Sequence, residues 1–138
     1  MTDTTDTTTD PTATASPELV ATLDTYLASL NELDDERRAG LVRTAWAEDG
    51  AFFDPLAEAV GHEALGNLTP QVQAMFPGAR FVRTSGIDTH HGILRFAWQL
   101  VGADGAVVVD GIDIGVVRDD GRLTRIAGFY GPVVPMER

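Results

Sequence analysis

The hydrophobic pattern of the chain changes once, at Pro77 and Gly78, and this change constrains the fold more than any other feature. Before it, apolar residues recur mainly at the three- and four-residue spacing of helices. After it, β-branched and aromatic residues dominate and are divided by turn residues, which predicts strands over residues 80–88, 93–101, 106–117 and 123–130. Helices followed by a strand meander are typical of an α+β domain, in which an antiparallel sheet packs helices against one face.

The first half predicts three helices with a short hairpin between the second and the third. The first helix begins with Ser16 as N-cap and Pro17 at the first helical position, and its buried face is formed by Leu19, Leu23, Tyr26, Leu27 and Leu30. The second begins at Asp34, carries an apolar stripe that includes Trp46, and is expected to end at residues 49–50. Residues 51–54 and 58–61 predict the hairpin. The third helix is expected from about His62 to Phe76, with a kink at Pro70.

Composition limits the domain count and the classes of partner. Residues 1–15 form a Thr/Asp-rich tract that is too polar to fold, so we expect a disordered tail followed by a single domain over residues 16–138. The net charge of -11, with the ten basic residues dispersed, disfavours nucleic acid. No apolar run approaches the roughly 20 residues that span a bilayer, and the N-terminus lacks a secretory pattern. We therefore expect a cytoplasmic protein that does not enter a membrane.

Asp113 lies within the longest predicted strand, among apolar residues. Because side chains alternate along a strand, an inward Asp113 places Val109, Gly111 and Gly115 on the same face and Asp110 on the opposite, solvent-exposed face. The two glycines leave room beside the acid. The alternative is that Asp113 faces outward on the sheet.

Three segments of the sequence resemble the nuclear-transport-factor-2-like superfamily. They are the stretch from Trp46 to Pro55, which reads WAEDGAFFDP, the stretch from Val109 to Ile114, which reads VDGIDI, and the closing segments 120–123 and 128–130. The resemblance covers about residues 18 to 131. Within the superfamily, the chain is similar to SnoaL-like and ketosteroid-isomerase-like members. It implies a cone-shaped α+β barrel, with three N-terminal helices on a curved, mostly antiparallel sheet that encloses a pocket. Fold alone leaves the function open, because members include isomerases, cyclases, epoxide hydrolases and non-catalytic domains.

The resemblance to ketosteroid isomerases also implies roles for individual residues. Asp54, before a proline, matches the proton-shuttling base, Asp113 matches the oxyanion-binding acid, and Tyr26 is the tyrosine of the first helix. By the same matching, the walls of a pocket for a small apolar molecule would be formed by Trp46, Phe96, Ile126 and Tyr130. A homodimer through the exposed sheet face is expected, with Trp98 as an interface residue.

The chemistry of such a site is general acid–base catalysis on a steroid- or polyketide-like carbonyl compound. A carboxylate removes a proton beside a carbonyl, and a second acid, kept protonated by apolar burial, stabilises the oxyanion. Each residue also has a structural interpretation: Asp54 as the acid of a turn, and Tyr26 as a helix-packing residue. A non-catalytic ligand-binding or dimerisation domain therefore remains the alternative to an isomerase or cyclase.

We expect neither a metal nor a cofactor. The adjacent histidines His90 and His91 are predicted to belong to a polar turn, since neighbouring strand residues point to opposite faces and two histidines alone do not make a metal site. His62 has no ligand partner at helical spacing. The sequence contains no cysteine, no phosphate-binding glycine loop and no nucleophile elbow.

Overall fold

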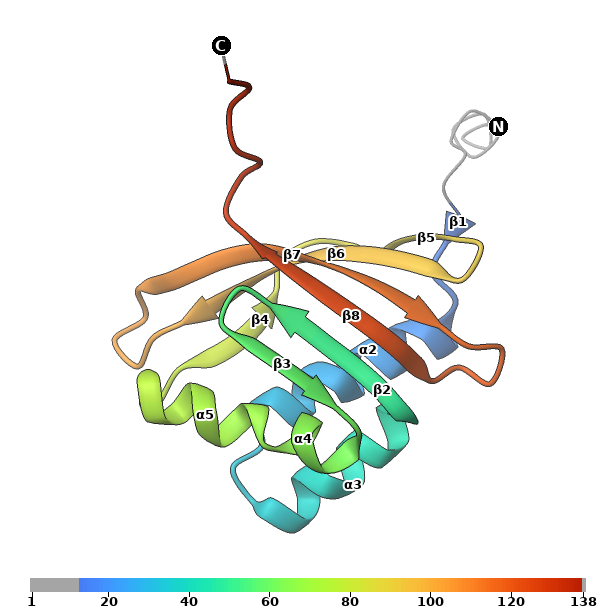
Figure 1. The fold of residues 1–138 in the computed structure, drawn as a ribbon, viewed down its shortest axis with the longest axis horizontal. Helices are drawn as coiled ribbons and strands as arrows, with labels where there is room; N and C mark the ends of the chain where they lie inside the picture. The colour runs from blue at the N-terminus through green and yellow to red at the C-terminus, as the bar shows by residue number, and fades with distance from the viewer. Residues whose placement is uncertain (1–12, 138) are drawn as a thin grey trace.

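The change of pattern at Pro77 and Gly78 divides the fold as predicted into a helical part and a sheet. The computed structural model describes residues 13–137. Within them the helices are α2 (Pro17–Asn31), α3 (Asp35–Ala45), α4 (His62–Gly66) and α5 (Leu68–Met75). The strands are β1 (Ala13–Thr14), β2 (Trp46–Asp54), β3 (Ala57–Val60), β4 (Arg80–Arg83), β5 (Asp88–His90), β6 (Ile93–Val101), β7 (Val107–Val117) and β8 (Leu123–Tyr130). All four helices lie on one side of the curved sheet, and the C-terminal segment leaves from the other side (Figure 1).

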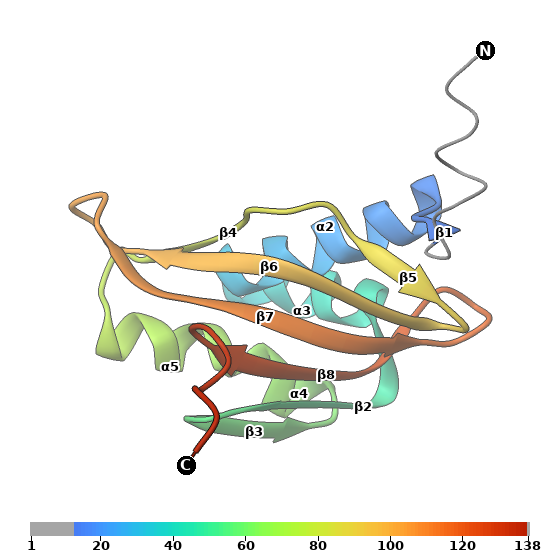
Figure 2. The ribbon, with the colours of Figure 1, turned by 90° about the horizontal axis from the view of Figure 1, so that it is seen from above.

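The sheet is mixed, strongly curved and open. Its order is β1-β5-β6-β7-β8-β2-β3, with β4 also paired to β6, and every pairing is antiparallel except that of β2 with β8. The strands turn around the helices so that the β2–β3 hairpin lies beside β8 (Figure 2). The predicted cone of helices on a mostly antiparallel sheet is confirmed, although the sheet does not close into a barrel.

The predicted helix starts are confirmed by their capping contacts. The Ser16 hydroxyl accepts the backbone N–H of Leu19 at 3.1 Å, and the Asp34 carboxylate accepts that of Arg37 at 2.9 Å. The predicted apolar face of the first helix is buried against the sheet, and Leu23 and Tyr26 are 0% and 1% exposed. These contacts fix the rotation of α2 and therefore the direction in which Tyr26 points.

Several predicted boundaries are corrected by the structure. The second helix ends at Ala45, and Trp46 already pairs with Leu123 as part of β2, because strand pairing outweighs the helical spacing of the apolar residues. The third helix breaks at Asn67 and not at Pro70, since Pro70 falls in the first turn of α5, where its missing N–H costs no helical bond. The single strand predicted over residues 80–88 is interrupted: β4 ends at Arg83, residues 84–87 are not in a strand, and β5 begins at Asp88, with both strands paired to β6.

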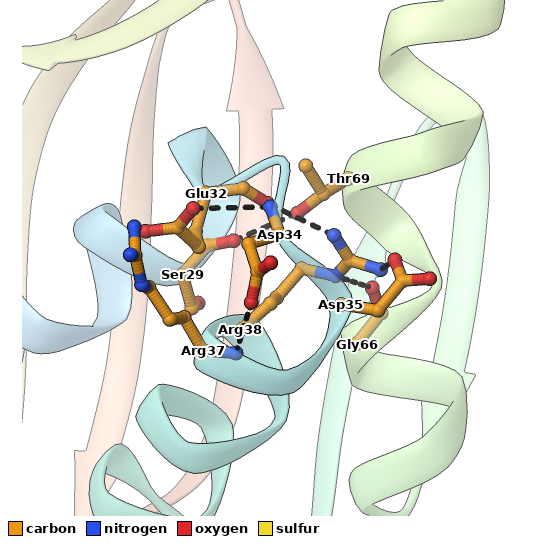
Figure 3. Close-up of polar contacts among 8 residues, drawn as sticks. All are labelled: Ser29, Glu32, Asp34, Asp35, Arg37, Arg38, Gly66 and Thr69. Atoms are coloured by element: carbon orange, nitrogen blue, oxygen red, sulfur yellow. Dashed lines mark hydrogen bonds and ion pairs between the residues drawn. The ribbon is translucent and has the colours of Figure 1, made fainter.

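Buried polar side chains join the helices to one another. The Arg38 side chain is only 8% exposed and donates to the backbone carbonyls of Gly66 and Glu32 at 2.8 and 2.9 Å. The Thr69 hydroxyl donates to the carbonyl of Ser29 at 2.8 Å and joins α5 to α2. Figure 3 shows these contacts, which link α2, α3 and the loop between them with α4 and α5. They hold α5 in the position from which it forms one wall of the pocket.

The prediction of a disordered tail lies mostly outside the described residues. Of residues 1–15, Ala13 and Thr14 form a two-residue strand that pairs with Thr89 and Asp88. Within residues 13–137, no helix has both the length and the apolar character needed to cross a membrane.

Candidate functional site

Asp113 lies inside the cone, on the concave face of β7. The alternation predicted for this strand is confirmed, because Asp113 is 4% exposed whereas its neighbours Ile112 and Ile114 are 42% and 36% exposed. Asp110 is on the exposed face, as predicted. An acid at an inward position of an apolar strand requires compensating donors, and two are present.

The two oxygens of Asp113 accept hydrogen bonds from two different elements. The Tyr26 hydroxyl, on α2, donates to Oδ2 at 3.2 Å, and the indole Nε1–H of Trp98, on β6, donates to Oδ1 at 2.9 Å. Gly111 makes the second contact possible, because a Cβ there would lie 2.6 Å from the Trp98 ring. Since an indole N–H can only donate, a proton on Asp113 is favoured on Oδ2, facing Tyr26.

Burial changes the protonation of this pair. Loss of solvent raises the pKa of the Asp113 carboxyl to about 7, against the opposing hydrogen bonds from Tyr26 and Trp98. Burial, followed by the nearby Asp113 charge, holds the pKa of Tyr26 well above its ordinary value. Around neutral pH, Asp113 therefore exchanges a proton readily while Tyr26 keeps its own.

Asp54 lies at the end of β2 and is half-buried. Its Oδ1 accepts the backbone N–H of Leu56 at 2.9 Å, and its Oδ2 accepts the hydroxyl of Tyr130 at 3.2 Å. The first contact is the turn contact expected of an Asp before Pro, so the structural interpretation of Asp54 is correct, and the same side chain also faces the pocket. Burial and the Asp54 carboxylate raise the pKa of Tyr130 to about 12, so Tyr130 stays a donor.

Gly128 on β8 separates the two acids. It pairs with Asp113 across the sheet, and a Cβ at this position would lie 2.9 Å from Asp113 Oδ1 and 3.4 Å from Asp54 Cβ. The parallel pairing of β2 with β8 brings the end of β2 to this point. Asp54 and Asp113 therefore share one cavity with only a glycine backbone between them.

The cavity has a volume of about 200 Å³ and is mainly apolar. Its walls come from α2, α5 and strands on both sides of Asp113, and include Leu30, Phe52, Leu68, Phe76, Phe81 and Leu100. Its polar members are Tyr26, Asp54, Gln71, Trp98, Asp113 and Tyr130. A concave apolar cavity with a few convergent polar groups is the usual form of a small-molecule site.

The structure brings together four of the residues predicted for the site. Asp54, Asp113, Tyr26 and Tyr130 all line the cavity. The other three, Trp46, Phe96 and Ile126, are instead in the core, at 1%, 2% and 0% exposure, and do not line it. They do point inward, but α2 fills that end of the cone, and the edge of the Trp46 ring packs on Tyr26 at 5.8 Å between centroids.

Trp98 is the site residue that the sequence analysis placed wrongly. We expected it on the outer sheet face at a dimer interface, whereas it is 5% exposed, lines the cavity and binds Asp113. Strand alternation in the sequence indicates the correct face, because Trp98 is at even spacing from Leu94, Phe96 and Leu100, all of which are buried.

Comparison with solved structures identifies the family. A protein from Agrobacterium tumefaciens strain C58, described as a candidate isomerase of the SnoaL-like family, shares 35% sequence identity, with 85% of this chain and 100% of that chain covered and a TM-score of 0.78. The chain belongs to the SnoaL-like family. No protein-family model matches the sequence, and no curated protein matches it either.

Two more distant structures have the same fold as this SnoaL-like protein. An NTF2-like protein from Exiguobacterium sp. 255-15 is 21% identical, with 81% of this chain and 99% of that chain covered and a TM-score of 0.61. A candidate SnoaL-like polyketide cyclase from Jannaschia sp. CCS1 is 14% identical, with coverages of 86% and 90% and a TM-score of 0.66. The NTF2-like fold predicted from the sequence is thereby confirmed.

The histidines of this SnoaL-like protein lie away from the cavity. The predicted turn is confirmed for His91, which has φ 52°, but not for His90, which ends β5 and pairs with Ile93. The two rings do not point to opposite faces, because their Nδ1 atoms are 3.1 Å apart. His62 Nε2 contacts the backbone carbonyl of Trp46 at 2.9 Å. Across residues 13–137, no group of three or more His, Asp or Glu side chains is arranged to hold a metal ion.

Proposed function

We propose that this protein is a cofactor-independent isomerase or cyclase that acts on an apolar carbonyl compound. The observation that carries the proposal is the presence of two acids with different surroundings in one apolar cavity. Asp113 is enclosed and has a raised pKa, whereas Asp54 is half-buried at the wall beside Tyr130. Pairs of acids whose environments differ in this way are suited to separate acid and base roles.

In the proposed reaction, the Asp54 carboxylate removes a proton from the carbon next to the substrate carbonyl. The electron pair of the broken C–H bond moves to the carbonyl oxygen, which becomes an oxyanion. In the structure the Tyr26 O–H donates to Oδ2 of Asp113. Once Asp113 is protonated, it donates to the Tyr26 oxygen instead, which frees the Tyr26 O–H to donate to the oxyanion. In an isomerisation, Asp54 then returns the proton to a second carbon. In a cyclisation, the enolate carbon attacks a second carbonyl, the electron pair of that C=O moves to its oxygen, and this alkoxide takes the proton from Asp54, which regenerates the base.

Tyr130 and Trp98 orient the two acids in this scheme. The Tyr130 hydroxyl holds one oxygen of Asp54, and the N–H of Leu56 holds the other. Trp98 occupies Oδ1 of Asp113, which directs the acid's proton toward Tyr26. The names of the Agrobacterium and Jannaschia proteins, a candidate isomerase and a candidate polyketide cyclase, support this reaction class.

The test is a comparison of wild type with Asp54→Asn on a panel of cyclic enones and polyketide-like ketones in D₂O. Isomerisation and deuterium incorporation are followed by NMR, and binding is followed by tryptophan fluorescence, to which Trp98 in the cavity wall contributes. We expect the variant to bind with unchanged affinity and to turn over about 10² to 10⁴-fold more slowly. Asp110→Asn, an exposed acid on the same strand as Asp113, is the matched control. Turnover in Asp54→Asn equal to that of wild type would exclude Asp54 as the base.

A second function, a dimerisation domain, is favoured by the outer face of the sheet. Five large apolar side chains on this face are 36% to 62% exposed: Ile93, Ile112, Ile114, Val116 and Phe129. Contiguous exposed apolar surface of this kind usually marks an association site. We propose that two copies of the chain pack through this face. Light scattering of wild type and Ile112→Lys tests the proposal. A dimeric wild type and a monomeric variant would support it, whereas a monomeric wild type would refute it.

A further inference from the structure

The mouth of the cavity has a rim of exposed apolar side chains. Leu56, Met75 and Val108 are 65%, 52% and 40% exposed, and all three line the same cavity as Asp113. They come from three separate elements: the β2–β3 turn, the end of α5 and the start of β7. These three segments lie at the same end of the molecule in both views (Figures 1 and 2). We call these three residues the rim.

The inner cavity is small relative to a multi-ring ligand. Its volume is about 200 Å³, compared with roughly 150 Å³ for an engineered protein cavity that binds benzene and roughly 300 to 1,000 Å³ for typical ligand pockets. The space beside Tyr26 and Asp113 therefore holds about one ring with small substituents. Any larger part of a ligand must leave through the mouth and pass over the rim.

Charge limits the ligand further. The residues that line the cavity include two acids, Asp54 and Asp113. Among the described residues, the lining contains no Lys, Arg or His. The chain as a whole has a net charge of -11. A carboxylate or phosphate in the cavity would therefore meet like charge without a compensating cation. The cavity favours a neutral molecule.

From these observations we infer that the substrate is a neutral ketone with its carbonyl on a single ring, which occupies the inner cavity. An apolar substituent on that ring contacts Leu56, Met75 and Val108, which are therefore the specificity-determining residues. This inference rests on the proposed function for the orientation of the carbonyl toward Tyr26 and Asp113. The substituent covers apolar side chains that water otherwise surrounds, and removal of that surface from water contributes to binding. A short substituent leaves the rim exposed and gains nothing from it.

The test uses two neutral probes that differ only in their substituent, 3-methylcyclohex-2-enone and 3-hexylcyclohex-2-enone. Their dissociation constants are measured by calorimetry for wild type, Leu56→Ser, Met75→Ser and the control Val60→Ser. Val60 is 56% exposed on β3 but does not line the cavity. All three substitutions are on the surface, so the fold is expected to persist, and thermal unfolding checks this.

We expect the hexyl compound to bind wild type more tightly than the methyl compound. Each rim variant should weaken binding of the hexyl compound by about tenfold, the usual scale for a lost apolar contact in a pocket, and leave the methyl compound unchanged. Val60→Ser should resemble wild type with both probes. Equal loss for both probes, no loss for either, or no binding of either compound would overturn the inference.

The same measurements in the Asp54→Asn background separate this inference from the proposed function. Binding does not require the base, so rim-dependent affinity should persist there even though turnover is lost. Rim-dependent binding without turnover in wild type would contradict the proposed reaction and support the ligand class. Turnover that depends on Asp54 but is indifferent to the rim would support the reaction and overturn the ligand class.

Discussion

Replacing Asp113 with Asn should remove a pH dependence of stability that wild type has. Burial is the main reason why the pKa of the Asp113 carboxyl rises from 3.8 to about 7 in the folded protein. Between these values the folded state holds a proton that the unfolded chain has released. The stabilisation is therefore complete below pH 3.8 and is lost as the pH rises through about 7. Wild type should be less stable at pH 8 than at pH 5 on account of this group.

The size of the effect follows from the shift. A pKa change from 3.8 to about 7 corresponds to about 4 kcal/mol in the free energy of unfolding, of which about 3 kcal/mol is lost between pH 5 and pH 8. Asn preserves both contacts, because its Oδ1 can accept the indole N–H of Trp98 while its Nδ2 donates to the oxygen of Tyr26. The variant therefore removes the ionisation with little change in packing.

The assay is urea unfolding of wild type, Asp113→Asn and Asp110→Asn at pH 5 and pH 8. Other titrating groups are common to all three proteins and cancel in the comparison. The stability of Asp113→Asn relative to wild type should rise by about 3 kcal/mol between the two pH values, whereas Asp110→Asn should follow wild type. Parallel behaviour of wild type and Asp113→Asn would refute the argument that burial raises the pKa of this acid.

Two further substitutions test the contacts around the site. Trp98→Phe removes a hydrogen bond that lowers the pKa of Asp113, so the pKa of this carboxyl should rise above about 7. Carboxyl ¹³C NMR follows the titration, and an unchanged or lower pKa would contradict a hydrogen bond from Trp98 to Asp113. Arg38→Met removes a buried side chain and leaves the part-buried carbonyls of Gly66 and Glu32 without their donor. It should destabilise the fold by about 2 to 4 kcal/mol in urea unfolding. The exposed neighbour Arg37→Met should change stability by less than about 0.5 kcal/mol, and equal effects of the two variants would contradict a special role for Arg38.

Local patterns predicted the residues whose positions depend on one element. Asp113 faces inward because of strand alternation, and Tyr26 faces inward because it shares the apolar face of α2 with Leu23 and Leu30. Both periods are properties of the backbone and can be read without knowing the neighbours. The caps of α2 and α3 were predictable for the same reason.

Contacts between distant elements were not predictable from these patterns. Residues 46–49 suit the end of a helix or the start of a strand, and the pairing of Trp46 with Leu123 on β8 decided for the strand. The same pairing brings Asp54 next to Gly128 and therefore next to Asp113. The position of Pro70 within α5 likewise depended on the break at Asn67, which the helical spacing did not indicate.

The sequence by itself determined the α+β class, the family resemblance, and the identity of Asp54, Asp113, Tyr26 and Tyr130 as candidate site residues. Only the tertiary structure decided which apolar residues form the cavity and which fill the core. It also showed that Trp98 binds Asp113 and that the rim is exposed. The reason is physical: alternation tells which face of a strand is buried, but the curvature of the sheet and the packing of α2 decide where along that face space remains.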